Sequence, residues 1–257
     1  MIELAPNEYA ALVDSILNSI TPPKAEAVPV AAVEIAPSPT ASNLAATLES
    51  TLLTADATRE QITRLCDDAE NWRLAAVCVN PCWVALAASR LRSTNVQVVT
   101  VVGFPLGASL SVSKRHEAAE CLKLGADELD MVINVGALKS GADDQVGADI
   151  RGVVELAHEA GARVKVILEM AYLTRDEQQR ACGIALAAGA DYIKTSTGFG
   201  ASGATVEDVA FLRSVIAAKA RIKAAGGIRT RAQAEALLAA GADRIGTSSA
   251  RTILDRP

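Results

Sequence analysis

The amino-acid sequence predicts an α/β protein, a (β/α)8 TIM barrel preceded by an N-terminal Pro/Ala-rich extension. The first observation behind this prediction is a short phrase that returns four times along the chain. It reads Leu-Gly-Ala-Asp at 124–127, Ala-Gly-Ala-Arg at 160–163, and Ala-Gly-Ala-Asp at 188–191 and 240–243. Each copy follows a helical stretch, and its glycine suits the left-handed residue that ends a helix. The phrase therefore marks a repeated passage from helix to strand.

The second observation is the number and spacing of the apolar segments. Eight of them are short enough to be strands, and seven helical stretches separate them within roughly 214 residues. The candidate strands are 48–53, 75–80, 97–103, 128–134, 163–169, 190–195, 221–225 and 243–247. A doubly wound open sheet is the alternative, but no Gly-x-Gly-x-x-Gly follows the first strand and charged residues alternate along several strands.

The first part of the chain has a different composition. Six of the nine prolines fall within residues 1–39, in a stretch without a sustained apolar period. We expect a short amphipathic helix at 7–20 and a semi-extended linker that ends at about residue 42. The predicted organisation is an extension at 1–42 and a barrel domain at 43–257.

Composition excludes several classes of function. The formal charge of −5 and the absence of a run of five basic residues argue against nucleic acid as a partner. No apolar run reaches the roughly 18 residues of a membrane span, and the first cationic side chain, Lys24, comes too late for a signal peptide. The five cysteines contain no Cys-x-x-Cys pair, so we expect free thiols in a reducing compartment, the cytoplasm. Small-molecule chemistry is the expected function.

Two lysines lie within segments that are expected to be buried strands. Lys194 is in the middle of 190–195, and Lys223 is in the middle of 221–225. Two ammonium groups in one interior repel each other and lose hydration, so at least one lysine should have a depressed pKa. A neutral buried lysine is a nucleophile for carbonyl groups.

The fourth candidate strand separates apolar from charged side chains. Leu129, Met131 and Ile133 alternate with Glu128 and Asp130. The apolar set is expected to pack under the helices, which turns the carboxylates into the barrel.

The same alternation turns further charges inward on the next strands. They are Lys165 and Glu169 on the fifth strand, Lys194 with Tyr192 on the sixth, and Lys223 on the seventh. A buried cluster of both signs is costly unless it is paired or functional, which makes the barrel interior the candidate site.

The last two strands end in sequences typical of phosphate-binding loops. Gly226 and Gly227 follow the seventh strand, and Gly246 begins a Gly-Thr-Ser-Ser run that ends at Ser249. In (β/α)8 barrels these two loops commonly hold phosphate through backbone amides and hydroxyls. An anionic, phosphorylated ligand is therefore expected.

Histidine chemistry is not indicated. The two histidines, His116 and His158, lie in charged helical stretches. Neither a histidine base nor a His-rich metal site is expected.

The motifs together resemble the deoxyribose-phosphate aldolase family of class I, Schiff-base aldolases, over about residues 48–249. The matching segments are Thr-Leu-Leu-Thr-Ala-Asp-Ala-Thr (51–58), Val-Cys-Val-Asn-Pro (77–81), Val-Val-Gly-Phe-Pro-Leu-Gly (101–107), Gly-Ala-Asp-Glu-Leu-Asp-Met-Val-Ile-Asn (125–134), Tyr-Ile-Lys-Thr-Ser-Thr-Gly (192–198), Lys-Ala-Ala-Gly-Gly-Ile-Arg-Thr (223–230) and Gly-Thr-Ser-Ser (246–249).

The resemblance implies roles for individual residues. The Schiff-base lysine of the family falls on Lys194, its second active-site lysine on Lys223, and its proton-handling aspartate on Asp130. Its phosphate-binding positions fall on Gly198, Gly226, Gly227, Gly246, Ser248 and Ser249. The expected supporting residues are Lys165, Thr51 and Cys78.

The activity that the resemblance implies is reversible cleavage of 2-deoxy-D-ribose 5-phosphate to D-glyceraldehyde 3-phosphate and acetaldehyde. It implies neither a metal ion nor an organic cofactor. The sequence leaves the oligomeric state open, and a homo-oligomer is compatible with it.

The chain departs from the family pattern at two places. Many members read Asp-His before Thr-Leu-Leu, where this chain has Glu49 and Ser50, so the site near the first strand is expected to be rearranged. The chain ends at Pro257 without the C-terminal tyrosine that relays protons in some members. That relay is expected to have no counterpart here.

Two other functions stay open on sequence grounds. A cofactor-free sugar-phosphate isomerase or epimerase could use Asp130 and Glu169 as paired acid and base. A non-catalytic barrel could serve as a scaffold, with the Pro-rich extension as its docking segment.

Overall fold

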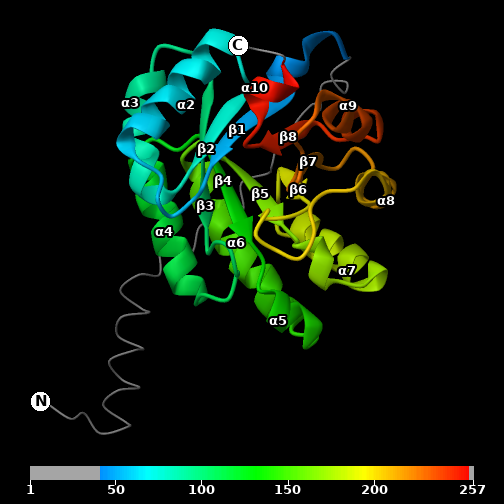
Figure 1. The fold of residues 1–257 in the computed structure, drawn as a ribbon. Coiled ribbons are helices and arrows are strands. Elements are labelled where there is room, and N and C mark those ends of the chain that lie inside the picture. Colours follow the sequence, from blue (N-terminus) through cyan, green and yellow to red (C-terminus); the bar gives the residue numbers. More distant parts are fainter. Residues whose placement is uncertain (1–40, 255–257) are drawn as a thin grey trace, which may run out of the picture. The chain divides into compact units, whose positions relative to one another are not determined.

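A computed structural model describes residues 41–254 of the chain, with side chains from Leu44 onward. The helix expected at 7–20 and nearly all of the linker expected at 21–42 lie outside the described residues. The described part is a closed barrel of parallel strands surrounded by helices (Figure 1).

The barrel strands run in chain order around the closed sheet. They are β1 (Leu48–Leu52), β2 (Ala76–Val79), β3 (Gln97–Val102), β4 (Glu128–Val132), β5 (Arg163–Ile167), β6 (Tyr192–Lys194), β7 (Arg221–Ala225) and β8 (Arg244–Thr247). The sheet closes where Leu48 of β1 lies beside Ile245 of β8. The predicted (β/α)8 fold and its strands are confirmed, although most strands are a few residues shorter than expected.

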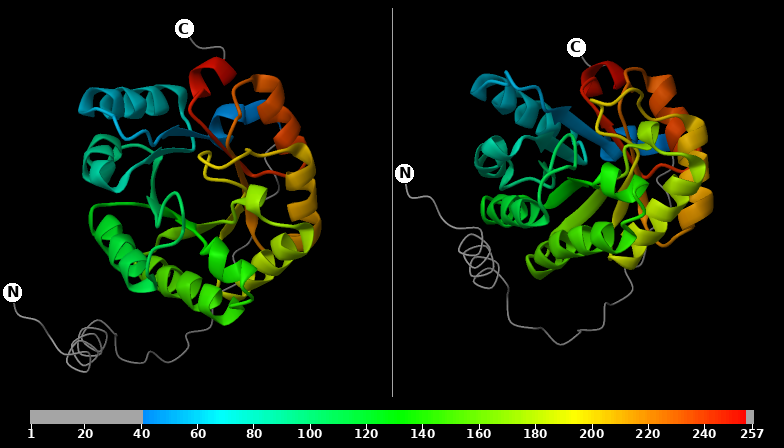
Figure 2. Two further views of the ribbon diagram at one scale, coloured as in Figure 1. Left: turned by 60° about the horizontal axis from the view of Figure 1, so that its bottom comes forward. Right: turned by 90° about the horizontal axis from the view of Figure 1, so that it is seen from below.

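The helices form a ring outside the strands (Figure 2). They are α2 (Arg59–Trp72), α3 (Val84–Leu91), α4 (Ser111–Lys123), α5 (Val135–Lys139), α6 (Asp143–Glu159), α7 (Arg175–Ala187), α8 (Val206–Ile216), α9 (Arg231–Ala239) and α10 (Ala250–Ile253). Short 3-10 turns are η1 (Ala41–Thr47), η2 (Pro81–Trp83) and η3 (Met170–Tyr172). The sequence did not separate α5 from α6, because α5 is barely more than one turn long.

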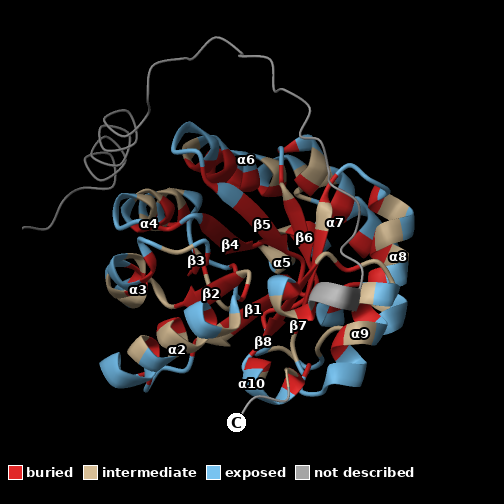
Figure 3. Cartoon of the chain, turned by 90° about the horizontal axis from the view of Figure 1, so that it is seen from above, coloured by how far each residue is buried: buried red, intermediate tan, exposed pale blue. Residues whose placement is uncertain are grey.

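The core lies in two places, and the strand alternation assigns residues to each. Leu129, Met131 and Ile133 of the β4 region are fully buried in the layer between strands and helices, as predicted. A smaller apolar cluster inside the barrel contains Leu53, Ala76, Cys78, Val99 and Val101. In Figure 3 the strands are the buried centre and the helices are exposed on their outer sides. The inner cluster leaves the remaining interior to charged side chains.

The repeated glycine phrase ends helices as predicted. Gly125, Gly161, Gly189 and Gly241 have φ values of 99°, 73°, 90° and 112°, which is the left-handed region that glycine adopts at little cost.

The aspartates of this phrase have a second role, which the sequence analysis did not anticipate. The Oδ2 atom of Asp127 accepts a hydrogen bond from the backbone N–H of Val98 at 2.7 Å. Asp191 accepts from Val164, and Asp243 from Ile222, both at 2.8 Å. Each such aspartate clamp ties the residue just before a strand to the second residue of the preceding strand.

None of the helices found between residues 41 and 254 is both long enough and apolar enough to cross a membrane.

Candidate active site

The carboxylate of Asp130 on β4 is the centre of a set of buried ion pairs. Its Oδ2 accepts from the Nζ of Lys194 on β6 at 2.7 Å and from the Nζ of Lys223 on β7 at 2.5 Å. Its Oδ1 accepts from Lys165 on β5 at 2.9 Å. Lys194 is 2% exposed, and the other three residues are 1% exposed or less. The structure thus brings together the three residues that the sequence analysis expected to be the nucleophile, the second lysine and the proton-handling aspartate.

Three further charged side chains surround this centre. Glu49 on β1 accepts a hydrogen bond from Lys223, and Glu128 on β4 lies 2.5 Å from Lys165. The Nη1 atom of Arg244 on β8 lies 3.5 Å from Glu49 and 3.6 Å from Glu128. We call the whole set the charge cluster; its members are Glu49, Glu128, Asp130, Lys165, Lys194, Lys223 and Arg244. The departure at Glu49 therefore places a carboxylate in direct contact with the second lysine.

The charge cluster lowers the pKa of one lysine and raises the pKa of the other two. Burial lowers the pKa of Lys194, and the nearby charge of Lys223 lowers it further, against the attraction of Asp130. Burial also disfavours the charged form of Lys223, but Asp130 and Glu49 outweigh it and raise the pKa of that lysine. The pKa of Lys165 is well above its usual value for the same reason, since three carboxylates face it. Lys194 is the lysine that loses its proton most readily.

The acidic members stay ionised despite their burial. Burial opposes ionisation of Asp130, yet the charges of Lys165, Lys194 and Lys223 hold its pKa well below its usual range. For Glu128 burial is likewise outweighed, by Lys165 and Arg244, and its pKa falls to about 2.

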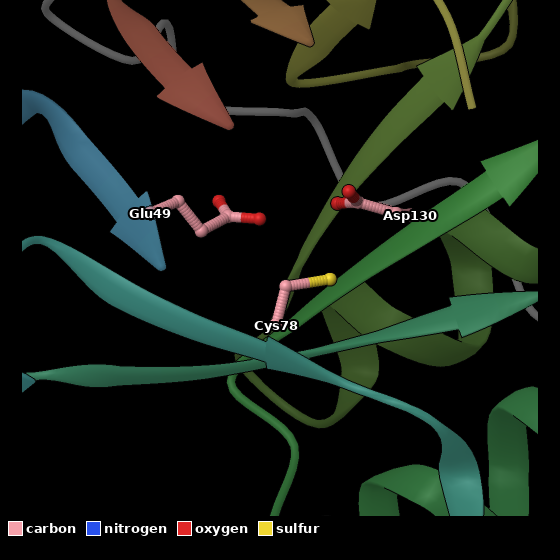
Figure 4. Close-up of side chains that lie close together, drawn as sticks. All are labelled: Glu49, Cys78 and Asp130. Carbon is pink, nitrogen blue, oxygen red and sulfur yellow. The ribbon is translucent and has the colours of Figure 1, made fainter. Parts of the chain in front are cut away.

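Glu49, Cys78 and Asp130 lie close enough together to be considered as ligands of a metal ion. Glu49, Cys78 and Asp130 point toward one another inside the barrel, with ligand atoms within 4.8 Å (Figure 4). Both carboxylates already face the ammonium group of Lys223, and burial raises the pKa of the Cys78 thiol to about 12. A cation would meet a neutral thiol and a positive lysine, so these residues do not fit a metal ion.

A pocket of about 260 Å³ opens above the two lysines at the C-terminal ends of the strands. Besides Lys194 and Lys223 it is lined by Thr51, Leu52, Leu53, Thr54, Thr197, Gly198, Phe199, Ala225, Gly226, Gly227, Ile228, Arg229, Gly246, Thr247 and Ser248. Five of the six expected phosphate-binding residues are among them. The sixth, Ser249, does not line the pocket; it precedes α10, and its backbone N–H donates to the hydroxyl of Thr247 at 2.9 Å.

The two glycine-rich loops of this pocket interlock. A side chain at Gly203 would place its Cβ 2.1 Å from the carbonyl oxygen of Gly226. The backbone N–H of Ala204 donates to the carbonyl oxygens of Ala225 and Gly226 at 3.1 and 3.2 Å. The loop after β6 and the loop after β7 are therefore packed directly against each other.

Glu169 lies in a different place from the one expected. The sequence analysis put it on the inward face of the fifth strand, but β5 ends at Ile167 and Glu169 has a left-handed φ of 54°. Its carboxylate accepts from the backbone N–H of Thr197 at 3.2 Å and from the hydroxyl of Thr197. Glu169 thus supports the loop after β6, and within residues 41–254 its carboxylate makes no hydrogen bond or ion pair with the lysines that surround Asp130.

Two residues of the site were missed from the sequence. Arg244 faces the barrel interior, and the alternation of Arg244 with Ile245 was the available signal. Arg229 contributes a cation at the exposed edge of the pocket. It stands two residues after Gly227, in a loop whose glycines indicate backbone donors and give no signal for a cationic side chain.

The closed parallel barrel has a buried lysine with a lowered pKa at the bottom of an open pocket. This combination is typical of class I aldolases, which are lyases that act through a lysine amine. Comparison with known proteins specifies the class further. Residues 43–256 match the DeoC/LacD family aldolases, and the chain belongs to that family.

Named relatives agree with this membership. The chain is 52% identical to a deoxyribose-phosphate aldolase of Geobacillus sp. (strain WCH70) over 214 residues, covering 83% of this chain and 96% of the relative. It is 53% identical to that of Thermococcus gammatolerans over 215 residues, with 83% and 96% covered. The solved tetrameric deoxyribose phosphate aldolase of Aeropyrum pernix superposes with a TM-score of 0.78 at 35% identity, covering 82% of this chain and 89% of that one.

Proposed function

We infer that the chain is an aldolase that reversibly cleaves 2-deoxy-D-ribose 5-phosphate to D-glyceraldehyde 3-phosphate and acetaldehyde. The observation that carries this function is the pairing of Lys194, whose pKa is lowered, with a glycine-rich pocket directly above it. The names of the relatives at about half identity supply the sugar phosphate.

In the proposed mechanism Lys194 is the nucleophile. Its neutral amine attacks C1 of the open-chain sugar, and loss of water gives an iminium. The positive nitrogen then accepts the electron pair of the C2–C3 bond as that bond breaks. The proton of the C3 hydroxyl leaves at the same time, so that C3 becomes the aldehyde carbon of the first product.

Asp130 is the proposed proton carrier for this step. It is ionised and bonded to Lys194, so it can take the C3 hydroxyl proton, directly or through a water, and return it to C2 of the enamine. Hydrolysis of the resulting iminium releases acetaldehyde and regenerates the amine. Lys223 stays protonated and opposes a second positive charge on Lys194.

The phosphate end of the substrate is assigned to the interlocked loops. Gly198, Gly226, Gly227, Ser248 and Arg229 line one pocket, so backbone N–H groups, a hydroxyl and a guanidinium are available there. Such donors suit a phosphate, and binding there positions C1 over the lysine.

The isomerase alternative is not favoured. It requires Asp130 and Glu169 to act as a pair, whereas Asp130 is bonded to lysines and Glu169 to Thr197. A scaffold without chemistry is also not favoured, because the family of the chain is a family of aldolases.

Reductive trapping tests the proposal. Borohydride added with acetaldehyde should leave an ethyl group on one lysine, and peptide mass mapping should place it on Lys194. An adduct on Lys223, or none, would overturn the assignment. Interconversion of sugar phosphates without release of acetaldehyde would point to the isomerase.

Assembly and location are further proposals. The Aeropyrum pernix relative is tetrameric, and we propose a homo-oligomer for this chain, to be measured by light scattering. A cytoplasmic location is supported by the five cysteines, which are all free. Cell fractionation tests it.

A further inference from the structure

The charge cluster contains an uneven number of charges. Its basic members are Lys165, Lys194, Lys223 and Arg244, and its acidic members are Glu49, Glu128 and Asp130; none is more than 8% exposed. With every group ionised the buried set carries a surplus of one positive charge. An unbalanced buried charge is costly, so the surplus favours loss of one proton from one lysine.

The contacts identify which lysine gives up its proton. Lys165 faces three carboxylates, at 2.5, 2.9 and 3.6 Å. Lys223 is bonded to two, Glu49 and Asp130. Lys194 is bonded to one, Asp130, which it shares with the other two lysines. Loss of the proton from Lys194 therefore breaks fewer ion pairs than loss of a proton from Lys165 or Lys223.

Arg244 supplies the charge that makes the surplus. Its Nη1 atom lies between Glu49 and Glu128, at 3.5 and 3.6 Å, and has no closer partner among the described residues. Arg244 cannot be neutralised at ordinary pH. Its charge therefore competes with the lysines for the same two carboxylates.

We propose, on the basis of the function proposed above, that Arg244 and Glu128 are positioning residues that set the balance between the two forms of Lys194: Arg244 favours the uncharged, nucleophilic form, and Glu128 favours the ammonium form. Neither lines the substrate pocket. They act in opposite directions through the charge balance of the cluster, Arg244 by its positive charge and Glu128 by its negative charge.

Other groups near Lys194 do not alter this balance. Asp130, Lys223, Glu49 and the thiol of Cys78 face it from β4, β7, β1 and β2. The thiol stays neutral, since burial raises its pKa to about 12. Arg163 touches Glu128 at 3.1 Å, but its side chain is 48% exposed, so solvent screens its charge.

The test is the pH dependence of the rate of acetaldehyde trapping on Lys194, measured on the full chain. Arg244→Met removes a positive charge and favours the ammonium form of Lys194, so the rise in rate should move to higher pH by about one unit. Glu128→Gln removes a negative charge and should move it to lower pH. Arg244→Lys keeps the charge and should stay near the wild-type midpoint.

The double variant Arg244→Met/Glu128→Gln separates charge from shape. It removes one charge of each sign, so its midpoint should return toward wild type even if its rate is lower. Single variants that shift in the same direction, or lose rate at an unchanged midpoint, overturn the proposal. If Arg244→Met does not fold, an unshifted midpoint in Glu128→Gln is enough to reject it. Absence of any adduct in the wild type would instead reject the proposed function.

Discussion

At the scale of single residues, the cluster explains how a lysine can be removed from the barrel interior without loss of the fold. Asp130 keeps two other ammonium partners, Lys165 and Lys223, when Lys194 is replaced. The remaining cluster then has three charges of each sign.

We expect Lys194→Ala to lower cleavage activity by at least about a thousandfold while the protein stays folded. The variant lacks the amine that is proposed to form the iminium, yet Asp130 keeps its ion pairs with Lys165 and Lys223. Cleavage rate and thermal unfolding, measured side by side, check both halves. Substantial residual turnover in a folded variant would contradict the assignment.

Lys223 is expected to act on Lys194 by charge. Lys223→Leu removes a like charge, which raises the pKa of Lys194 and moves the rise in cleavage rate to higher pH. Lys223→Arg keeps the charge and should preserve the midpoint better, although the guanidinium shape can lower the rate. If the leucine variant rises at the wild-type pH, desolvation alone sets the nucleophile.

The sequence predicted which residues meet at the centre of the site and most of the residues expected around it, but it missed Arg244 and misplaced Glu169. Lys194, Lys223 and Asp130 stand out because charged residues interrupt apolar strands. Arg244 begins its strand, where a charge looks like an ordinary surface residue, and only closure of the barrel places it between Glu49 and Glu128. Glu169 was placed wrongly because the in–out alternation of a strand was assumed to continue to residue 169, whereas β5 ends at Ile167.

At the scale of elements, the pocket depends on the close approach of two loops. Gly203→Ala would force a Cβ against the carbonyl group of Gly226, at a cost of about 1–3 kcal/mol of stability. We expect the KM for the phosphorylated sugar to rise about tenfold, because the loops that are proposed to hold phosphate are pushed apart. Steady-state kinetics and thermal unfolding measure both effects.

A matched control is available on a neighbouring helix. Gly183 lies exposed in α7, and a Cβ there would meet nothing within 4 Å. Gly183→Ala should leave KM unchanged and raise stability by about 0.5–1 kcal/mol, because alanine favours the helix. A similar rise in KM in both variants would show that loop contact is not the cause.

At the scale of the whole molecule, the extension is predicted to be dispensable. Deletion of residues 1–42 leaves the family match at 43–256 intact and retains Leu44, which is 5% exposed and part of the core. We expect a folded barrel whose kinetic constants stay within about twofold of the full chain. Insoluble protein after truncation would mean that the extension covers an apolar surface.

The three aspartate clamps each join two neighbouring strands of the barrel. They join β3 to β4, β5 to β6 and β7 to β8, whereas the copy of the phrase at the start of β5 has Arg163 in place of the aspartate. The connection between β4 and β5 is therefore a seam that no clamp crosses. A chain break between β4 and β5 would leave both residues of each clamp in the same fragment. A break between β5 and β6 would instead separate Asp191 from Val164. The ion pairs of Lys165 with Glu128 and Asp130 cross the same seam, so charged side chains of the cluster join the two halves where a clamp is missing.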